Sequence, residues 1–145
     1  MSRLRRAVPG QTRGMSVIGW EPFTAVSLVE PTVRRLGERT CVINVGTELR
    51  HIELPGIDDA VRAILVDGCQ DIVFDLTYLR RYEPFALVRL AREWDRLAET
   101  GCDVHVAARE PRVVTDLERL AGTSGWELHP SASQALRALL SAPVG

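Results

Sequence analysis

Short apolar runs rich in β-branched residues recur along the chain and predict β-strands. They alternate with stretches in which apolar residues repeat every three or four positions, which indicates amphipathic helices. Asp71–Asp75 (DIVFD) is almost continuously apolar between two acids, as expected of a strand buried on both faces of a sheet. The predicted strands are residues 25–29, 41–46, 71–75, 102–108 and 126–128, the first two paired with each other.

Four helices are predicted among these strands. The first covers 57–65 and the second 84–99, which starts at Pro84, a residue suited to the first helical position. The third opens at Pro111 and stops at Gly122, and a capping-box pattern at 131–134 leads into the last. The order β-β-α-β-α-β-α-β-α predicts an α/β fold with a five-stranded mixed, mostly parallel sheet and about four helices.

The length of 145 residues indicates one domain with a modest tail. A hydrophobic fraction of 46% and a charged fraction of 26% are typical of a soluble globular protein. Residues 1–22 contain glycines and prolines without a sustained period, so we interpret them as a flexible tail and 23–142 as the domain.

The tail is basic, with Arg3, Arg5, Arg6 and Arg13 and no acid before residue 14. Such an arm can bind nucleic acid or an anionic membrane surface, but a solvated tail is the interpretation we prefer, and no nucleic-acid partner is expected. If Met15 is the true start of translation, the arm has no function. No apolar run approaches the ~20 residues needed to cross a bilayer, and the N-terminus lacks the apolar region of a signal peptide. We therefore expect a cytoplasmic protein without membrane insertion.

The three cysteines, Cys41, Cys69 and Cys102, are odd in number and form no CxxC motif. Two of them lie in apolar runs, which predicts reduced, buried thiols.

The three histidines, His51, His105 and His129, are far apart in the sequence and lack the spacing of a zinc site. His105 alternates with two valines on a predicted strand, which favours a buried histidine with a satisfied ring over a metal ligand.

Motifs for catalysis are missing from the sequence. It has no GxSxG elbow and no phosphate-binding GxxxxGK[ST] loop. The acids at 58, 59, 71 and 75 suit helix caps and strand ends. We therefore predict no catalytic residue, metal or cofactor, and interpret the chain as a binding module.

The segment DIVFDLTYLRRYEPFALVRL at 71–90 resembles the centre of the STAS domain, the module of bacterial anti-sigma factor antagonists. Residues 47–50 lie where that family has a GELD-like turn, 110–113 resemble its SPRV-type helix opening, and 126–140 resemble its closing strand and helix. The resemblance covers about 23–142.

The resemblance implies a non-catalytic regulator that works by partner switching. In this family the unmodified antagonist binds an anti-sigma factor, often a serine kinase, and the sigma factor is released. Phosphorylation of a serine in a DSSGL motif at the start of the second helix prevents binding, because it adds about −1.5 to −2 charges to the contact surface. The implied partner is an anti-sigma factor or serine kinase-like protein; whether the chain is also a homodimer stays open.

The family's switch motif is degenerate in this chain. Aligning Asp75 and Leu76 with the family pattern places residues 83–87 (EPFAL) on DSSGL. Pro84 and Phe85 replace both serines, so no hydroxyl remains at the switch position. Arg50 stands where the GELD turn has its Asp, so we expect the acidic surroundings of that turn to change sign. Phosphorylation at another hydroxyl stays open, with Thr47, Thr77 and Tyr78 as alternatives.

Helix geometry places Phe85 on the solvent side of the second helix, together with Arg89, Arg92 and Arg96 and opposite its leucines. An exposed aromatic beside arginines has the composition of a protein-interface hot spot. In the alternative interpretation Phe85 packs on a nearby loop and the arginines pair with Glu93 and Asp95. The predicted partner-binding residues are Glu48, Arg50, Arg80, Arg81, Tyr82, Glu83, Phe85, Arg89 and Arg92.

Two other functions remain open. One is a STAS subunit that docks on a membrane transporter ATPase. The other is a small-molecule or nucleotide sensor that uses a cleft beside the 48–50 turn.

Overall fold

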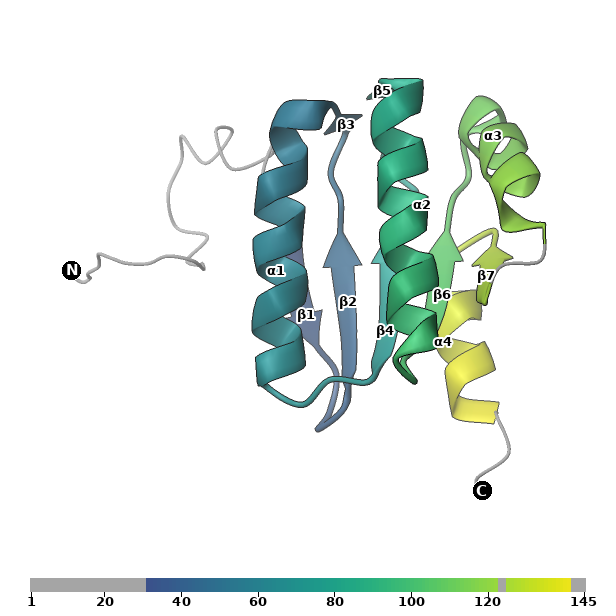
Figure 1. Ribbon diagram of the computed structural model, residues 1–145. Coiled ribbons are helices and arrows are strands. Elements are labelled where there is room, and N and C mark those ends of the chain that lie inside the picture. The colour runs from purple at the N-terminus through teal and green to yellow at the C-terminus, as the bar shows by residue number, and fades with distance from the viewer. Residues whose placement is uncertain (1–30, 123–124, 142–145) are drawn as a thin grey trace, which may run out of the picture.

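Five strands form the central sheet, and the computed structural model describes them within residues 31–122 and 125–141 (Figure 1). The spatial order is β1-β2-β4-β6-β7; β1 is antiparallel to β2 and the remaining neighbours are parallel. This confirms the predicted five-stranded, mostly parallel sheet. The strands are β1 (Thr32–Arg35), β2 (Thr40–Asn44), β4 (Asp71–Asp75), β6 (Asp103–Ala107) and β7 (Trp126–His129).

The first strand differs from the prediction. The strand that pairs with β2 is β1, which starts directly after Pro31 and turns back through Gly37, whose φ of 114° suits glycine. This stretch was predicted to separate two strands. All four residues of β1 are exposed at the sheet edge, so they lack the apolar pattern that identifies a strand. The strand predicted at 25–29, the 1–22 tail and the domain boundary near 23 lie outside the described residues.

A second, two-stranded sheet was not predicted. β3 (Glu48–Leu49) runs parallel to β5 (Arg81–Tyr82), with Glu48 opposite Arg81 and Leu49 opposite Tyr82. Strands of two residues are too short to show a period of two. This small sheet lies at the end of the molecule where α2 begins (Figure 1).

The helices that follow Pro84, Pro111 and the 131–134 capping box begin where the sequence signals place them, whereas the first helix begins at Leu54, three residues before the predicted start. Glu110 caps α3 by accepting a hydrogen bond from the Arg112 backbone N–H at 2.9 Å, and Ser131 Oγ accepts one from Gln134 N–H at 3.1 Å before α4. No helix of the described residues is long and apolar enough to cross a membrane. The helices are the 3₁₀ helix η2 (His51–Glu53), then α1 (Leu54–Val66), α2 (Pro84–Glu99), α3 (Pro111–Ala121) and α4 (Ala132–Ser141).

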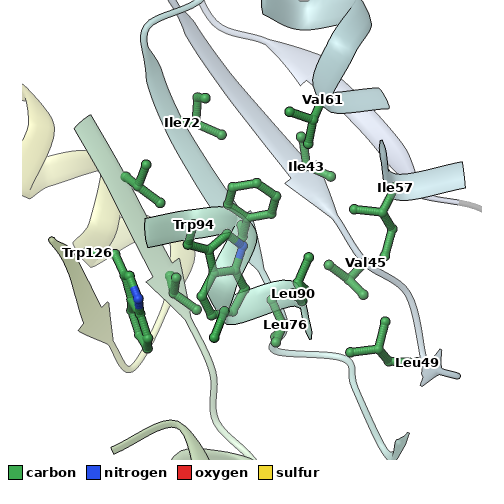
Figure 2. Close-up of a cluster of buried hydrophobic side chains, with 14 of the residues drawn as sticks. Ile43, Val45, Leu49, Ile57, Val61, Ile72, Leu76, Leu90, Trp94 and Trp126 are labelled. Carbon is green, nitrogen blue, oxygen red and sulfur yellow. The ribbon is translucent and has the colours of Figure 1, made fainter. Parts of the chain in front are cut away.

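The main core lies between the sheet and the helices α1, α2 and α3. Trp94 of α2 is its largest fully buried side chain; its ring lies 5.4 Å from that of Phe74 and 4.9 Å, edge-on, from that of Trp126. Figure 2 shows the two tryptophans side by side, with aliphatic side chains from the sheet and α1 around them. A smaller cluster lies on the opposite face, where α4 covers Val42 and Val73 with Ala135. Leu65, which belongs to the apolar repeat of α1, is exposed.

The prediction of three reduced cysteines is wrong for two of them. Cys41 of β2 and Cys69, just before β4, are joined by a disulfide with a Cα–Cα distance of 6.3 Å, and Cys102 is free. The two cysteines are 28 positions apart and share no motif; they meet because β2 and β4 are neighbouring parallel strands. Both are buried, as expected.

Candidate protein-interaction surface

Two segments that are distant in the sequence meet at the start of α2. Arg80 N–H and Arg81 N–H donate to the Thr47 carbonyl at 2.9 and 3.2 Å, and Glu83 N–H donates to the Leu49 carbonyl at 2.9 Å. The β3–β5 pairing and these bonds hold the 47–53 turn against the 80–85 loop. The predicted partner-binding residues of the two segments therefore lie together. We call the exposed or half-exposed part of this region the α2 N-terminal surface: Glu48, Arg50, His51, Ile52, Arg80, Arg81, Glu83, Phe85 and Arg89.

Phe85 is the most exposed aromatic side chain of the described residues, with 70% of its surface accessible. It is the second residue of α2, and the opposite side of that helix buries Leu87 and Leu90. The expectation that Phe85 faces outward is confirmed. Its neighbours Pro84 and Arg89 are also exposed, so nothing on its own helix covers the ring.

The arginines of this region fall into two groups. Arg89 reaches Asp58 of α1 at 3.4 Å, and Arg96 pairs with Glu93 as the alternative interpretation expected. Arg80, Arg81 and Arg92 are exposed and form no ion pair with any residue of 31–122 or 125–141. Arg80 and Arg81, in the loop before Phe85, are thus available for carboxylates of another molecule, whereas Arg92 lies further along α2.

Arg50, which was expected to change the charge sign of the 47–50 turn, pairs with carboxylates of the same chain. Arg50 lies 3.0 Å from Glu53 and 3.4 Å from Glu48. The hydrogen bond and charge of Glu53, aided by Glu48 and Glu83, raise the pKa of Arg50 above its ordinary value. These carboxylates balance the charge of Arg50, while Arg80 and Arg81 lie against the same turn. The sign of the charge around the turn therefore stays a prediction. Glu48 and Glu53 are close to Arg50 in the sequence, so a local signal was available for them, whereas Glu83 comes near the turn only through the fold.

Glu83 is held as a carboxylate at the N-cap of α2. Its Oε1 accepts the His51 backbone N–H at 3.0 Å and lies 3.3 Å from His51 Nδ1. These hydrogen bonds, the backbone one first, lower the pKa of Glu83. A negative charge here also interacts favourably with the N-terminal end of the helix dipole. Glu83 therefore places a fixed negative charge two residues before Phe85.

Tyr82 is directed away from this surface. The side chain is half-buried against α3, where its hydroxyl donates to Asp116 Oδ2 at 2.5 Å and the Arg112 guanidinium lies 5.8 Å from the ring centre. Burial first, then the contact with Asp116, raises the pKa of Tyr82 to about 12. The structure thus separates Tyr82 from the other predicted binding residues of the loop.

Sequence reasoning missed Ile52 as a member of the surface. It lies in η2 between His51 and Glu53 and is 58% exposed. The available signal was an isoleucine that belongs to no apolar repeat, in a turn just before a helix. Together with Phe85 it gives the surface two apolar side chains among charged ones.

The alternative hydroxyls lie in different surroundings. Thr47 and Tyr78 are exposed, whereas the Thr77 hydroxyl is half-buried and donates to Asp75 Oδ1 at 2.6 Å. Thr77 and Tyr78 also line a cavity of about 350 Å³ between the carboxyl ends of the parallel strands and the start of α4. The 48–50 turn contributes no residue to this cavity.

Two histidines that are 24 positions apart, and that share no zinc-site spacing in the sequence, meet on the α4 side of the sheet. His105 Nδ1 and His129 Nε2 are 2.8 Å apart, because β6 and β7 are adjacent parallel strands. His105 is buried with both ring nitrogens engaged, as predicted for a strand histidine. Burial first, and then the charge of His105, lowers the pKa of His129.

The fold and the candidate site together define a class of α/β proteins. Among the described residues, a mixed sheet has three helices on one face and one on the other. The candidate site is an exposed surface suited to protein contacts, and no catalytic cluster of residues was found in the described part of the chain. Solved structures place it more closely. An anti-sigma factor antagonist from Mycobacterium paratuberculosis matches with a TM-score of 0.63 and 25% identity, over 77% of this chain and 93% of that one. The unphosphorylated form of the anti-sigma factor antagonist SpoIIAA matches with a TM-score of 0.61 and 13% identity, over 77% and 99%.

The phosphorylated form of SpoIIAA, a Bacillus cell fate determinant, matches with a TM-score of 0.56 and 14% identity, over 75% of this chain and 98% of that one. The chain contains a STAS-like domain, as the resemblance indicated. No protein-family model and no curated protein sequence matches the chain.

Proposed function

We propose that this protein is a non-catalytic regulator that acts like an anti-sigma factor antagonist, by direct contact with an anti-sigma factor or a serine kinase-like protein. The observation that carries the proposal is Phe85, an exposed aromatic at the start of α2. The similarity to solved anti-sigma factor antagonists, one of them 25% identical, supports it.

The physical argument concerns the cost of leaving Phe85 in water. Burying a phenylalanine side chain contributes roughly 1.5–3 kcal/mol relative to exposure, and the fold of this chain does not use that energy. Aromatic and arginine side chains are enriched where proteins bind each other. With Ile52 in the adjacent turn and unpaired Arg80 and Arg81, the α2 N-terminal surface contains two exposed apolar side chains and several charged ones.

The proposed partner cannot regulate this surface by phosphorylating the start of α2. Residues 83–87 (EPFAL) contain no hydroxyl, so a kinase bound at α2 has no acceptor there. The carboxylate of Glu83 is already present in the unmodified protein. We infer that binding is constitutive or is controlled at another residue.

The test is capture of the partner with two baits. The full chain and its Phe85→Ala variant are immobilised, exposed to an extract of the source organism, and the bound proteins are identified by mass. We expect the full chain to capture an anti-sigma factor or serine kinase-like protein that the variant does not retain. Capture of a transporter ATPase by the same surface would instead support the transport-subunit alternative. Equal capture of every protein by both baits would contradict the proposal.

A variant that restores the hydroxyl tests the alignment. Phe85→Ser places a serine where the family has one. A captured kinase given ATP should phosphorylate this serine and then dissociate from the variant. Modification of the wild-type protein at residues 83–87 would contradict the proposed register.

A further inference from the structure

A cluster of nitrogen and carboxylate ligands lies at the β6–β7 edge of the sheet, away from α2. His105 is the register partner of Glu127, and His129 follows two residues later on β7, so all three side chains point to the face that α4 covers. The distance from His105 Nδ1 to His129 Nε2 is 2.8 Å, and Glu127 Oε1 lies 3.7 Å from the first atom and 3.6 Å from the second. One donor atom from each residue therefore converges on one point.

The hydrogen bond of Asp103 determines which nitrogen of His105 is available. Asp103, two residues earlier on β6, accepts from His105 Nε2 at 3.0 Å. A carboxylate accepts only from a protonated nitrogen, so in the neutral ring Nδ1 carries the lone pair, and it points at His129. An acid that orients the far nitrogen of a histidine is the usual support of a metal-bound imidazole.

The spacing of the three atoms fits a small divalent ion. Atoms with these separations lie on a circle of about 2.0 Å radius, close to the ~2.0–2.2 Å bonds from zinc to imidazole nitrogen and carboxylate oxygen. Tetrahedral coordination requires the two nitrogens, now at hydrogen-bond distance, to move about 0.5 Å apart. Calcium needs six to eight oxygens at longer distances, and magnesium prefers oxygen and water. Two imidazoles favour zinc or a similar transition metal.

We propose that His105, His129 and Glu127 form a binding site for one Zn²⁺, with Asp103 as the positioning residue for His105 and water as the fourth ligand. When the ion binds, His129 Nε2 loses its proton to solvent and Nδ1 of the same ring takes one up, so that both facing nitrogens present lone pairs to Zn²⁺. The ion enters from the sheet edge, because the Glu127 side chain is 69% exposed while that of His105 is 5% exposed.

The proposed ion joins the last strand to the body of the sheet. β7 is an edge strand whose only neighbour among the described strands is β6, and the site bridges these two. A metal that binds the folded form alone stabilises it by mass action. Zinc would therefore strengthen attachment of the C-terminal strand and α4, a role independent of the proposed partner contact.

The test is titration of untagged full-length protein with Zn²⁺, followed by calorimetry and thermal unfolding, with Co²⁺ absorbance reporting the ligand set. We expect one ion per chain and a higher unfolding midpoint with zinc. Glu127→Gln and His129→Ala should each weaken binding at least ~10-fold, and Asp103→Ala ~10–100-fold. His51→Ala removes the third histidine, which lies in η2, and is the matched control that should bind like the wild type. Glu127 is exposed, so its variant keeps the test decisive if His129→Ala does not fold.

Two results would overturn the proposal. One is the absence of zinc binding by the wild type at zinc concentrations up to about 0.1 mM, because a preformed site should have a lower dissociation constant than this. The other is unchanged affinity in folded Glu127→Gln and His129→Ala, which would place the ion elsewhere. The free thiol of Cys102 is the main competitor, so each measurement is repeated in a Cys102→Ser background, where we expect the same values.

Discussion

The two faces of the central sheet differ in what they bury. One face packs against α1, α2 and α3 in a continuous apolar core that includes Trp94 and Phe74. Within residues 31–122 and 125–141, the other is covered by α4, and its apolar cluster is smaller. The same strands supply both faces: Phe74 points to the large core and Val73 to α4, although both are fully buried.

The asymmetry follows from the topology. The parallel strands β2, β4, β6 and β7 lie in chain order, and each is joined to the next by a helix. Right-handed crossovers that all step in one direction place their helices on one face. Among the described residues, it is the helix after β7, α4, that covers the other face. A thinly covered face tolerates polar side chains such as His105, so stability is concentrated on one side and metal-binding chemistry is possible on the other.

Truncating Phe74 and Val73, adjacent residues of β4, tests how differently the two faces of the sheet contribute to stability. Phe74→Ala should lower the free energy of unfolding by about 3–5 kcal/mol, because it opens a cavity beside Trp94. Val73→Ala removes two methyl groups and should cost about 2 kcal/mol. Urea denaturation of both variants gives the comparison, and equal losses would show that the two faces contribute alike.

Removing the disulfide tests how much this covalent bond contributes to the stability of the large core, to which both cysteines belong. Closing a loop of this length stabilises a protein by about 3 kcal/mol, so Cys69→Ser or reduction should lower stability by that amount. Thiol titration of the denatured, non-reduced protein should find one free thiol, that of Cys102. Three free thiols would contradict the pairing and favour the reducing compartment expected from the sequence.

The Tyr82–Asp116 hydrogen bond ties the α2 loop to α3, and Tyr82→Phe should cost about 1 kcal/mol. Because the pKa of Tyr82 is raised from 10.0 to about 12, its contribution is present below pH 10 and is lost as the pH rises from 10 to 12. The urea midpoint should fall over this window in the wild type and less in Tyr82→Phe. Tyr78→Phe keeps the bond and is the control; if both variants behave like the wild type, the bond does not contribute.

Much of the fold follows from local patterns. The buried strand at 71–75 and the helix that starts at Pro84 have the predicted bounds, because a continuous apolar run and a helix-starting proline are local signals. Exposed β1 and two-residue β3 and β5 carry no such signal, since pairing with a neighbour defines them.

In the candidate site, too, locally determined features could be predicted and features that depend on distant residues could not. Helix periodicity was enough to place Phe85 outward, because its own helix determines that direction. The disulfide and the His105–His129 contact are made by residues distant in the sequence. Strand register brings them together, and no spacing rule along the chain contains that information.

The central claim is that Phe85 serves binding and not folding, and the most direct measurement compares both properties in one variant. Phe85→Ala should change the free energy of unfolding by no more than ~0.5 kcal/mol. It should raise the dissociation constant of the partner complex, measured by calorimetry, about thirtyfold. Val66→Ala, which truncates an 81% exposed side chain at the last residue of α1, should leave both unchanged. A loss of stability near 3 kcal/mol with unaltered affinity for the captured partner would contradict the account.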